Sequence, residues 1–508
     1  MFTGTAFSLL PPVLAIILAL ITKQVYLSLF AGVILGSLMI GNFRLFPSLE
    51  ILYKLMSENF DVSIILFLIV LSMDIVLIQK SGAAAAYSKW ASARLKTKRA
   101  SLLATSLLGI LIFVDDGFNC LTIGTVMRPV TDRYKVSRAK LAYIIDATAA
   151  PVCIIAPVSS WAAAINSYVP DGAGISGFQL FMKTIPYNLY ALLTIFMVFF
   201  TSASGFDFGL MKRYEDRALA GDLGVPEKNN SNQKDQEENE KVTGQGARLI
   251  DMILPMIMLI VLSIGFMFYT GYRAGGKGLV GCFANCNSAE SLFLAALMVL
   301  IFLCIYYPIR RIWHFGDIME IIPEGAKLMI PFMVILVLAW TLKGAIGKLE
   351  AGVFISSIMK SGSSLTHFIP VLSFAIAVFI SFSSGTSWGT FAIMVPLVIG
   401  LFTGQKNLSL MTVSVAAVLS GAVCGDHISP ISDTTIMSSS GALCRHLEHV
   451  RSQIQYAIPV IISCFAGFII SGFSESPVPG LIGSLAMLLL ILFIIKRTTK
   501  KTSRINNP

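Results

Sequence analysis

Five aspartates stand inside stretches that are otherwise apolar, and they are the residues most capable of chemistry. A carboxylate at the centre of a bilayer costs at least about 2.5 to 3.5 kcal/mol, so an acid kept there is a functional candidate by default. The five acids are Asp115, Asp116, Asp146, Asp426 and Asp433. Asp74 lies in a plainer apolar span, where a role in packing or helix pairing is as good an interpretation as a functional one.

Hydroxyl and amide side chains gather beside these acids. A small hard cation such as Na⁺ is bound by several oxygens, which hydroxyls, carboxylates and unwound backbone carbonyls supply together. The sequence therefore predicts a cation site with Asp116 and Asp433 as Na⁺ ligands. The other predicted site residues are Asn119, Thr148, Ser159, Ser160, Ser384, Thr386, Ser387, His427, Ser432 and Thr434. The alternative is that these hydroxyls only bond their own helix or join neighbouring helices.

The same acids suggest a way to exchange two cations. An acid that binds Na⁺ when ionised and a proton when neutral trades one for the other by competition. His427, next to Asp426, is able to share or tune that proton, and a purely structural histidine is the equal alternative. His446 and His449 are expected in a solvated cytoplasmic turn and not at a metal site. No cofactor is expected, because Na⁺ is here the transported ion.

The composition sets the fold class. Of 508 residues, 55% are hydrophobic and only 13% are charged, against about 25% charged in a soluble domain. Apolar runs near the bilayer-crossing length recur along the chain, beginning with a retained first span over 1–20. We expect an all-α polytopic membrane protein with no separate catalytic domain. The net charge of +10 lies in short loops, as topology-setting charge does, and not in a nucleic-acid-binding patch.

Two basic loops, 80–99 and 128–140, both belong in the cytoplasm by the positive-inside rule. Only the apolar stretch 100–127 separates them, and a single crossing would place one loop outside. We therefore predict a re-entrant helical hairpin with its tip at 114–118. The next stretch, 139–163, is predicted to be a discontinuous transmembrane helix, because prolines interrupt it.

The second half repeats this plan in the opposite orientation. A hairpin is predicted over 367–402 and a discontinuous helix over 410–437, in keeping with two inverted-topology repeats. The polar segment between the halves is too polar to fold alone and is predicted to be disordered. The predicted divisions are a first repeat over 1–205, a cytoplasmic linker over 206–247, a second repeat over 248–475, and a last transmembrane helix with a basic cytoplasmic tail over 476–508.

Two further patterns have alternative interpretations. The run from Gly385 to Gly389 matches the nucleophile-elbow pattern with Ser387 as nucleophile, but that motif needs a strand-to-helix turn, which the apolar flanks do not predict. Cys282 and Cys286 lie in a loop predicted to be external, where a disulfide is possible. The cysteines inside apolar runs, Cys120, Cys153, Cys304 and Cys464, are expected to be small buried apolar residues without a redox role.

Four runs together resemble the NhaC family of sodium/proton antiporters. They are Phe113–Asn119, Ala156–Trp161, Ser383–Gly389 and Cys424–Thr435. The resemblance covers essentially the full chain, and it implies an inverted-repeat fold, a homodimer and cation exchange. Members of that family are also thought to exchange Na⁺ or protons for malate, lactate or amino acids.

We therefore predict a Na⁺/H⁺ antiporter of a bacterial inner membrane and not an enzyme. The N-terminus is expected outside, the C-terminus in the cytoplasm and lipid around the helices. The alternative is a Na⁺- or H⁺-coupled transporter of a small organic acid or amino acid, and a passive channel is the other non-enzymatic class. No Lys or Arg is expected near mid-depth, which favours a small cation over an organic anion.

Overall fold

The computed structural model describes residues 2–22, 24–83, 86, 91, 94–169, 175–224, 247–278, 282, 285–350, 365–402 and 407–505. These residues form helices and connecting segments without any strand, so the predicted all-α class is confirmed. Within this described part, eight helices are long and apolar enough to cross a membrane. That composition fits the predicted polytopic membrane protein.

The helices follow one another along the whole described chain. The first half contains η1 (Ala6–Leu9), α1 (Leu10–Thr22), α2 (Val25–Ile40), α3 (Leu45–Glu58), α4 (Val62–Lys80), α6 (Lys98–Leu111), α7 (Asp116–Arg133), α8 (Arg138–Thr148), α9 (Ala150–Cys153), α10 (Ser160–Tyr168), α11 (Gly177–Thr184), η2 (Ile185–Tyr187), α12 (Leu189–Ser204) and α13 (Gly209–Leu219). The second half contains α15 (Ile250–Arg273), α17 (Ser288–Ile309), α18 (Phe315–Leu328), α19 (Ile330–Lys348), η3 (Leu365–Phe368), α21 (Ile369–Ser384), α22 (Ser387–Leu401), α23 (Leu408–His427), α24 (Asp433–Ala442), α25 (His446–Ser474) and α26 (Pro477–Ile505).

Helices end where the sequence predicts hairpin tips. Between α6 and α7 the chain is non-helical over 112–115, and the Asp115 side chain accepts a hydrogen bond from the Phe118 N–H at 3.0 Å as the cap of α7. Between α21 and α22 the break lies at Gly385 and Thr386. Gly385 has φ +67°, and a Cβ there would lie 2.6 Å from the Ile431 carbonyl oxygen, so this close turn requires glycine.

Both predicted discontinuous helices are also interrupted. The first is divided into α8, α9 and α10, with Ser159 capping α10 by accepting from the Ala162 N–H at 3.1 Å. The second is divided into α23 and α24 by residues 428–432, with Ser432 capping α24. Side-chain caps satisfy backbone donors that a broken helix leaves free, so both interruptions are locally stabilised.

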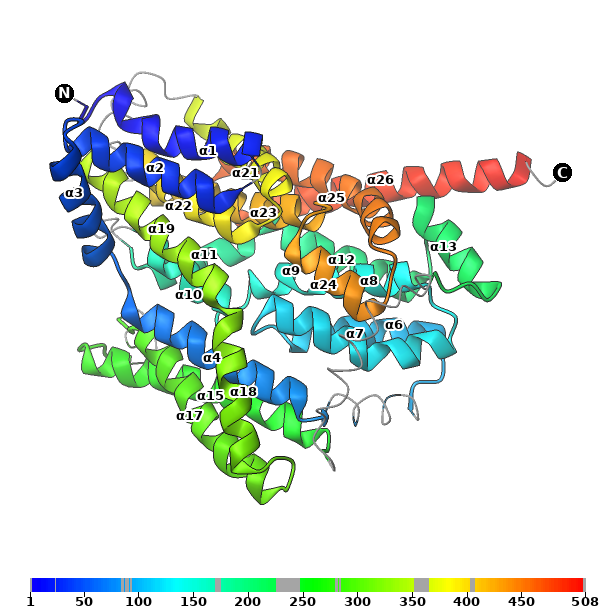
Figure 1. Ribbon diagram of the computed structural model, residues 1–508. Helices are drawn as coiled ribbons and strands as arrows, with labels where there is room; N and C mark the ends of the chain where they lie inside the picture. The colour runs from blue at the N-terminus through cyan, green and yellow to red at the C-terminus, as the bar shows by residue number, and fades with distance from the viewer. Residues whose placement is uncertain are drawn as a thin grey trace.

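The broken helices of the two halves pack on each other in the middle of the molecule (Figure 1). Helix α24 lies against α7 and α8, and α23 lies against α21 and α22. The crossing of α7 and α24 is close, since a Cβ on Gly124 would lie 2.4 Å from the Gly441 backbone. Segments about 300 residues apart in the chain therefore form one polar centre.

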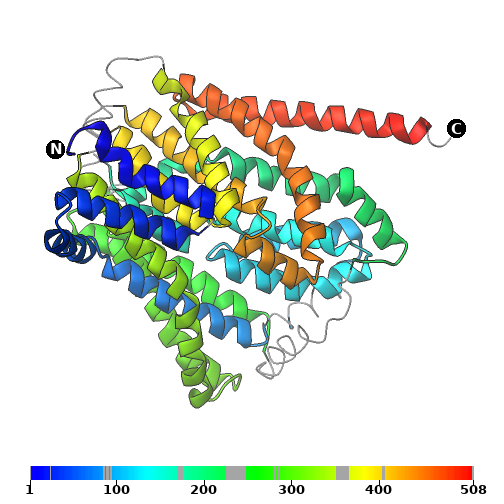
Figure 2. The ribbon, with the colours of Figure 1, turned by 45° about the horizontal axis from the view of Figure 1, so that its top comes forward.

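A second group of helices lies at the lower side of Figure 1, where α4 packs against α17 and α18, and α15 against α17. Helix α18 approaches α4 closely, because a Cβ on Gly325 would lie 2.6 Å from the Met73 Cα. The view in Figure 2 shows α26 at the edge of the molecule beside α25, with its C-terminal end projecting beyond the other helices.

The predicted first span over 1–20 begins later than expected. Residues 6–22 form η1 and then α1 without a gap, and α1 packs against α2. The apolar stretch over 179–200 is divided into α11, η2 and α12, because Pro186 interrupts the helix and the Asn188 side chain caps the next one.

The predicted linker is not uniformly without structure. Helix α13 lies within it and buries Met211, Glu215 and Ala218, which gives this polar segment an apolar face to pack on α8 and α25. Residues 225–246, which carry the most polar part, lie outside the described residues. The possible disulfide is not formed, since Cys282 and Cys286 are both free thiols.

Candidate functional site

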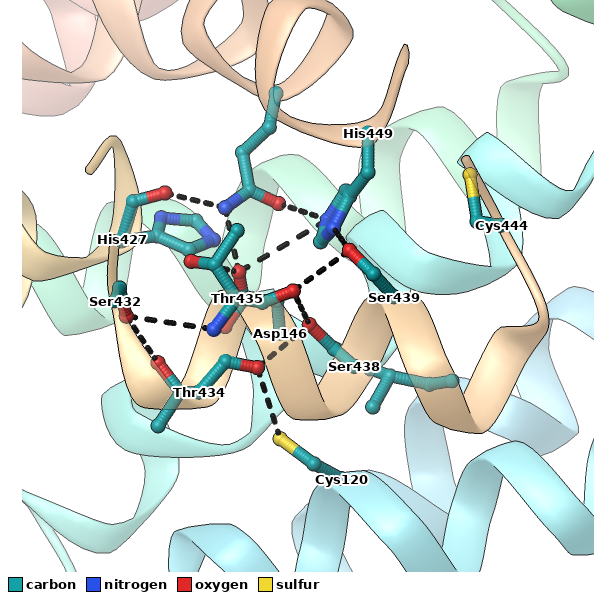
Figure 3. A network of polar contacts seen from close by, with 12 residues as sticks. Cys120, Asp146, His427, Ser432, Thr434, Thr435, Ser438, Ser439, Cys444 and His449 are labelled. Carbon is teal, nitrogen blue, oxygen red and sulfur yellow. Dashed lines mark hydrogen bonds and ion pairs between the residues drawn. The ribbon is translucent and has the colours of Figure 1, made fainter. Parts of the chain in front are cut away.

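Asp146 on α8 is fully buried and joins the two halves of the chain. Its Oδ2 accepts hydrogen bonds from Thr435 Oγ1 on α24 at 2.9 Å and from Gln453 Nε2 on α25 at 2.6 Å (Figure 3). Its Oδ1 has no hydrogen-bond partner among the described residues, and Thr434 lies close enough to the carboxyl group to interact with it. One carboxylate oxygen is therefore fixed, and the other is available to a ligand.

Asp426, near the end of α23, has the same division of its two oxygens. Its Oδ2 accepts from Ser387 Oγ at 2.8 Å and from the Ser387 N–H at 3.3 Å, whereas Oδ1 has no partner within the described part of the chain. Ser387 is the first residue of α22, so the acid receives a backbone N–H and a hydroxyl from one helix start. Ser432 lies close to the same carboxyl group.

Asp115 and Asp116 occupy the start of α7 and are both buried. Asp115 Oδ2 accepts from Ser160 Oγ at 3.3 Å, and the Ser160 N–H donates to the Val114 carbonyl at 3.1 Å. The break before α7 is thus bonded to the start of α10. The charge of Asp116 lies within interaction range of Asp115 and of Asp426.

The acids of the two halves consequently form one electrostatic cluster. Asp426 interacts with Asp116 and with Asp146. Like charges this close repel one another in a medium of low dielectric constant. A bound cation or proton relieves that repulsion, which is the electrostatic requirement for a site that holds one or the other.

Asn119 lies at the site, and its amide group joins separate backbone segments by hydrogen bonds. Its Nδ2 donates to the carbonyls of Gly109 at 2.7 Å, Ile112 at 2.8 Å and Thr148 at 3.2 Å. These bonds connect α6, the break before α7 and the end of α8. The Asn119 Oδ1 remains without a partner among described residues, so the amide is both a structural tie and a possible ligand.

Several predicted hydroxyls bond locally, as the alternative interpretation expects. Thr148 Oγ1 donates to the Ile144 carbonyl, Ser384 Oγ to the Ile380 carbonyl, and Ser159 Oγ to two carbonyls of its own loop. Thr386 and Ser384 are half-buried at the break between α21 and α22. Ser432 Oγ and Thr434 Oγ1 lie 3.0 Å apart at the start of α24.

The predicted pair of Na⁺ ligands is divided between two environments. Asp116 is buried, but Asp433 is exposed at the start of α24. The two acids therefore differ in how deeply they lie within the protein, because the turn before α24 directs Ser432 inward and leaves the Asp433 side chain at the surface of the helix bundle. No group of three or more His, Cys, Asp or Glu residues suited to a metal occurs within the described ranges.

Histidines contribute more to this centre than the sequence predicted. His427 is buried, with Nδ1 2.6 Å from the Tyr190 hydroxyl and its ring stacked on Tyr143. His449, expected in a solvated turn, is fully buried 3.9 Å from Asp146 Oδ2. The solvated-turn prediction is wrong because α25 begins at His446, which places His449 one turn along the inner face of a helix.

The residues missed by sequence reasoning are Gln453 and Tyr190. Gln453 is fully buried and connects Asp146, His449 and the His427 carbonyl. Its spacing of four from His449 places both side chains on one face of a helix, and that was the available signal. Tyr190 carries no comparable signal in an apolar helix.

Basic residues also lie deeper than expected. Lys140, assigned to a cytoplasmic loop, is fully buried in α8, where Nζ donates to Asp207 Oδ1 at 2.7 Å and lies 5.0 Å from the Tyr456 ring centroid. Arg138 is buried and donates to Asp132 at 2.7 Å and to the Ala442 carbonyl at 2.9 Å. Both cations lie in the first turn of α8, before Asp146, and are neutralised by acids or carbonyls.

The remaining buried acid is Asp74 on α4. It is 2% exposed, and neither carboxylate oxygen has a hydrogen-bond partner within the described residues. Cys304 and Tyr307 of α17 lie within interaction range. Asp74 is thus separate in its contacts from the cluster around Asp146.

Ser387 does not occupy a nucleophile elbow. It begins a helix after a helix, and its hydroxyl donates to Asp426 and to the Ala422 carbonyl at 3.2 Å. Neither of these two hydrogen-bond partners of Ser387 is a histidine that could act as a general base. A hydrolase triad of the expected kind is not formed by these hydrogen bonds.

The chain is similar to known transport proteins. An uncharacterised protein of Haemophilus influenzae is 36% identical over 522 residues, covering 98% of this chain and 96% of that protein. The malate-2H⁺/Na⁺-lactate antiporter of Bacillus subtilis is 30% identical over 180 residues, or 35% of this chain and 37% of the antiporter. The crystal structure of the Alcanivorax borkumensis YdaH transporter aligns with a TM-score of 0.50 at 11% identity, covering 89% of this chain and 98% of that one, and this likeness concerns the fold alone.

A family description covers the part of the site that the second half of the chain supplies, including Asp426 but not Asp116 or Asp146. The model of the Na⁺/H⁺ antiporter family matches residues 162–473, which is more than half of the chain. The resemblance found in the sequence is confirmed, and the chain is a multi-pass membrane transporter, not an enzyme. The chain belongs to the Na⁺/H⁺ antiporter family.

Proposed function

We propose that the protein exchanges Na⁺ for protons across the membrane at the cluster formed by Asp146, Asp426 and Asp116. One observation carries the proposal: Asp146 and Asp426 are buried in interrupted helices, each with one oxygen hydrogen-bonded and the other without a partner among described residues. A free carboxylate oxygen in that setting must take a cation or a proton, because an unpaired buried charge is costly.

The oxygens near the two acids suit Na⁺. Thr434 lies close to Asp146, and Ser432 close to Asp426, so hydroxyl and carboxylate oxygens are supplied without a bulky side chain. The amide oxygen of Asn119 and the carbonyls of the breaks add neutral ligands. Sodium and protons then compete for the same acids, and transport of one ion drives the other in the opposite direction.

The proposal includes a membrane arrangement. Helices α6 and α7, and α21 and α22, are two re-entrant hairpins, and the chain consists of two inverted repeats with the divisions predicted from the sequence. The protein lies in a bacterial inner membrane as a homodimer, with the N-terminus outside and the C-terminus in the cytoplasm. The interruptions near the polar centre support this arrangement, since irregular backbone at membrane depth is tolerated where protein or a wet cavity surrounds it.

An organic acid exchanged with Na⁺ or protons is the second candidate function. The Bacillus subtilis relative, which matches about a third of this chain, is named a malate-2H⁺/Na⁺-lactate antiporter, and that name favours the organic-acid function. The charge at the site argues against it. The buried cations described here, Lys140 and Arg138, are already paired with Asp207 and Asp132, and the cluster itself is acidic.

Exchange in proteoliposomes with imposed Na⁺ and pH gradients tests the proposal. With the wild-type protein, a Na⁺ gradient is expected to change the pH of the vesicle lumen. Asp426→Asn is expected to lower the rate of this pH change by about 100-fold, because a neutral amide does not balance the positive charge of a bound Na⁺. Asp216→Asn, at an exposed acid paired with Lys212 on α13, is the matched control.

Three outcomes distinguish the alternatives. Saturable exchange and counterflow support an antiporter, and a linear, non-saturable flux indicates a channel. If neither gradient drives the other but labelled malate or lactate moves against a Na⁺ or proton gradient, the organic-acid function replaces the one proposed. If Asp426→Asn exchanges ions at the wild-type rate, the assignment of the site is wrong.

A further inference from the structure

Two histidines and a serine form a continuous chain of hydrogen-bonding groups that leads away from Asp146. Ser439 Oγ on α24 lies 2.8 Å from His449 Nδ1 and 3.1 Å from His446 Nδ1. His449 is fully buried and His446 is half-buried at the start of α25. Figure 3 shows Ser439 and His449 on the side of Asp146 opposite to Ser432. The chain therefore runs from the buried acid towards the surface.

The outer nitrogens of both histidines face groups that only accept hydrogen bonds. His446 Nε2 lies 2.7 Å from the Pro430 carbonyl oxygen, and His449 Nε2 lies 2.7 Å from Gln453 Oε1. The orientation of Gln453 is fixed because its Nε2 donates to the His427 carbonyl and to Asp146. Each histidine must therefore carry a proton on its Nε2.

The inner nitrogens then depend on a single hydroxyl proton. If both histidines are neutral, both Nδ1 atoms are acceptors, and Ser439 is able to donate to only one of them. One additional proton completes the chain: either His446 or His449 becomes an imidazolium that donates to Ser439, and Ser439 donates to the other ring. In the other arrangement, Ser439 donates its proton to the Thr435 carbonyl at 2.7 Å. Both histidines must then be imidazolium to donate to the Ser439 oxygen, and two positive charges lie side by side.

We infer that His446, Ser439 and His449 form a proton-binding chain that holds one shared proton and moves its positive charge between half-buried His446 and buried His449, 3.9 Å from Asp146. The inference rests on the proposed exchange function for its role, and on the hydrogen-bond count for the proton itself. In the transfer, His446 gives its Nδ1 proton to Ser439 Oγ as Ser439 gives its own proton to His449 Nδ1. No bond other than O–H and N–H bonds is made or broken, and one positive charge moves inward.

The state of Asp146 decides where the proton resides. Burial favours the charge on half-buried His446, because a buried cation loses hydration. An ionised Asp146, 3.9 Å from His449 Nε2, attracts the charge inward, and Na⁺ or a proton on Asp146 removes that attraction. The other titratable groups facing the chain are His427 and Cys444, and Glu448 on the same helix is paired with Arg217 and Arg445.

Ser439→Ala tests the chain, since it removes the connecting hydroxyl and leaves both histidines. Ser438→Ala is the matched control, because Ser438 Oγ donates only to the Thr434 and Thr435 carbonyls of its own helix. Ser439→Thr restores a hydroxyl. Each variant is reconstituted for Na⁺-driven proton flux, and each is labelled with ¹⁵N-histidine in lipid nanodiscs to follow the protonation of His446 and His449 by NMR.

We expect Ser439→Ala to lower proton flux by about tenfold or more, with Ser438→Ala and Ser439→Thr close to wild type. In the NMR titration, His446 and His449 should respond together in wild type and independently in Ser439→Ala. Flux and coupled titration that are both unchanged in Ser439→Ala would overturn the inference. If wild type shows no Na⁺-driven flux but its two histidines still titrate together, the exchange function fails and the proton-binding chain stands.

Discussion

Asp146 and Asp74 are both buried acids in apolar helices, and they have opposite surroundings. Asp146 accepts hydrogen bonds from Thr435 and Gln453 and lies near another acid, Asp426. Asp74 accepts none from the described residues, and the titratable groups within interaction range of it include Cys304 and Tyr307. Donors stabilise the ionised form of a carboxyl group, and their absence favours the neutral acid. Burial alone therefore does not separate a transport site from packing.

The helices around each acid reinforce the contrast. Asp146 lies where interrupted helices meet, with non-helical residues at 149 and 428–432 beside it. Asp74 lies in the middle of the uninterrupted α4, packed against α17 and α18. Unpaired backbone groups at a break are potential ligands, and a continuous helix has none. We interpret Asp74 as a neutral packing group.

The largest expected effect comes from changing the two acids in the same way. Asp146→Asn should lower Na⁺-driven proton flux in proteoliposomes by about 100-fold, because the amide neither carries charge nor exchanges a proton. Asp74→Asn should change the flux by less than about twofold, since an amide has nearly the size of a neutral carboxylic acid and replaces no charge. A large loss in Asp74→Asn would remove the distinction between the two regions.

Much of this contrast was foreseeable from the sequence. The four helix interruptions were predicted from the placement of two basic loops, from prolines and from the repeat of this plan in the second half, and the structure places breaks there. The pairing of Thr435 and Gln453 with Asp146 was not foreseeable, because it joins residues 289 and 307 positions apart. Hydropathy also gives no sign of the break at Pro186 between α11 and α12, because it reports apolar length and not where a helix ends.

Burial of polar side chains was the least predictable feature. Lys140 and His449 were assigned to loops because charged and imidazole groups near helix ends are usually solvated. Both are buried because a partner neutralises or bonds them, Asp207 from a later segment for Lys140 and Gln453 from the next turn of the same helix for His449. Asp433 shows the reverse, an acid expected inside that is exposed. One residue in a helix-starting turn changes which side chain faces inward.

An intermediate effect is expected at Asn119, which supports the Asp146 region without holding charge. Asn119→Ala removes the amide nitrogen that bonds three buried carbonyls and should lower the free energy of unfolding by about 1–3 kcal/mol. Thermal unfolding in detergent measures the loss. Asn59→Ala is the control, because Asn59 Nδ2 donates only to the Leu55 carbonyl of its own helix. Equal thermal midpoints for Asn119→Ala and Asn59→Ala would contradict the role of Asn119 in joining these backbone segments.

The smallest expected effect is a gain of stability at Asp74. Asp74→Leu replaces an unbonded acid by an apolar side chain in an apolar setting, and it should raise the free energy of unfolding by about 1 kcal/mol. The same change at Asp146 should lower that free energy, because it leaves the Thr435 hydroxyl and the Gln453 amide without their acceptor. Thermal midpoints in detergent measure both. If Asp74→Leu is clearly destabilising, Asp74 has a partner that its packing does not reveal, and the neutral-acid interpretation is wrong.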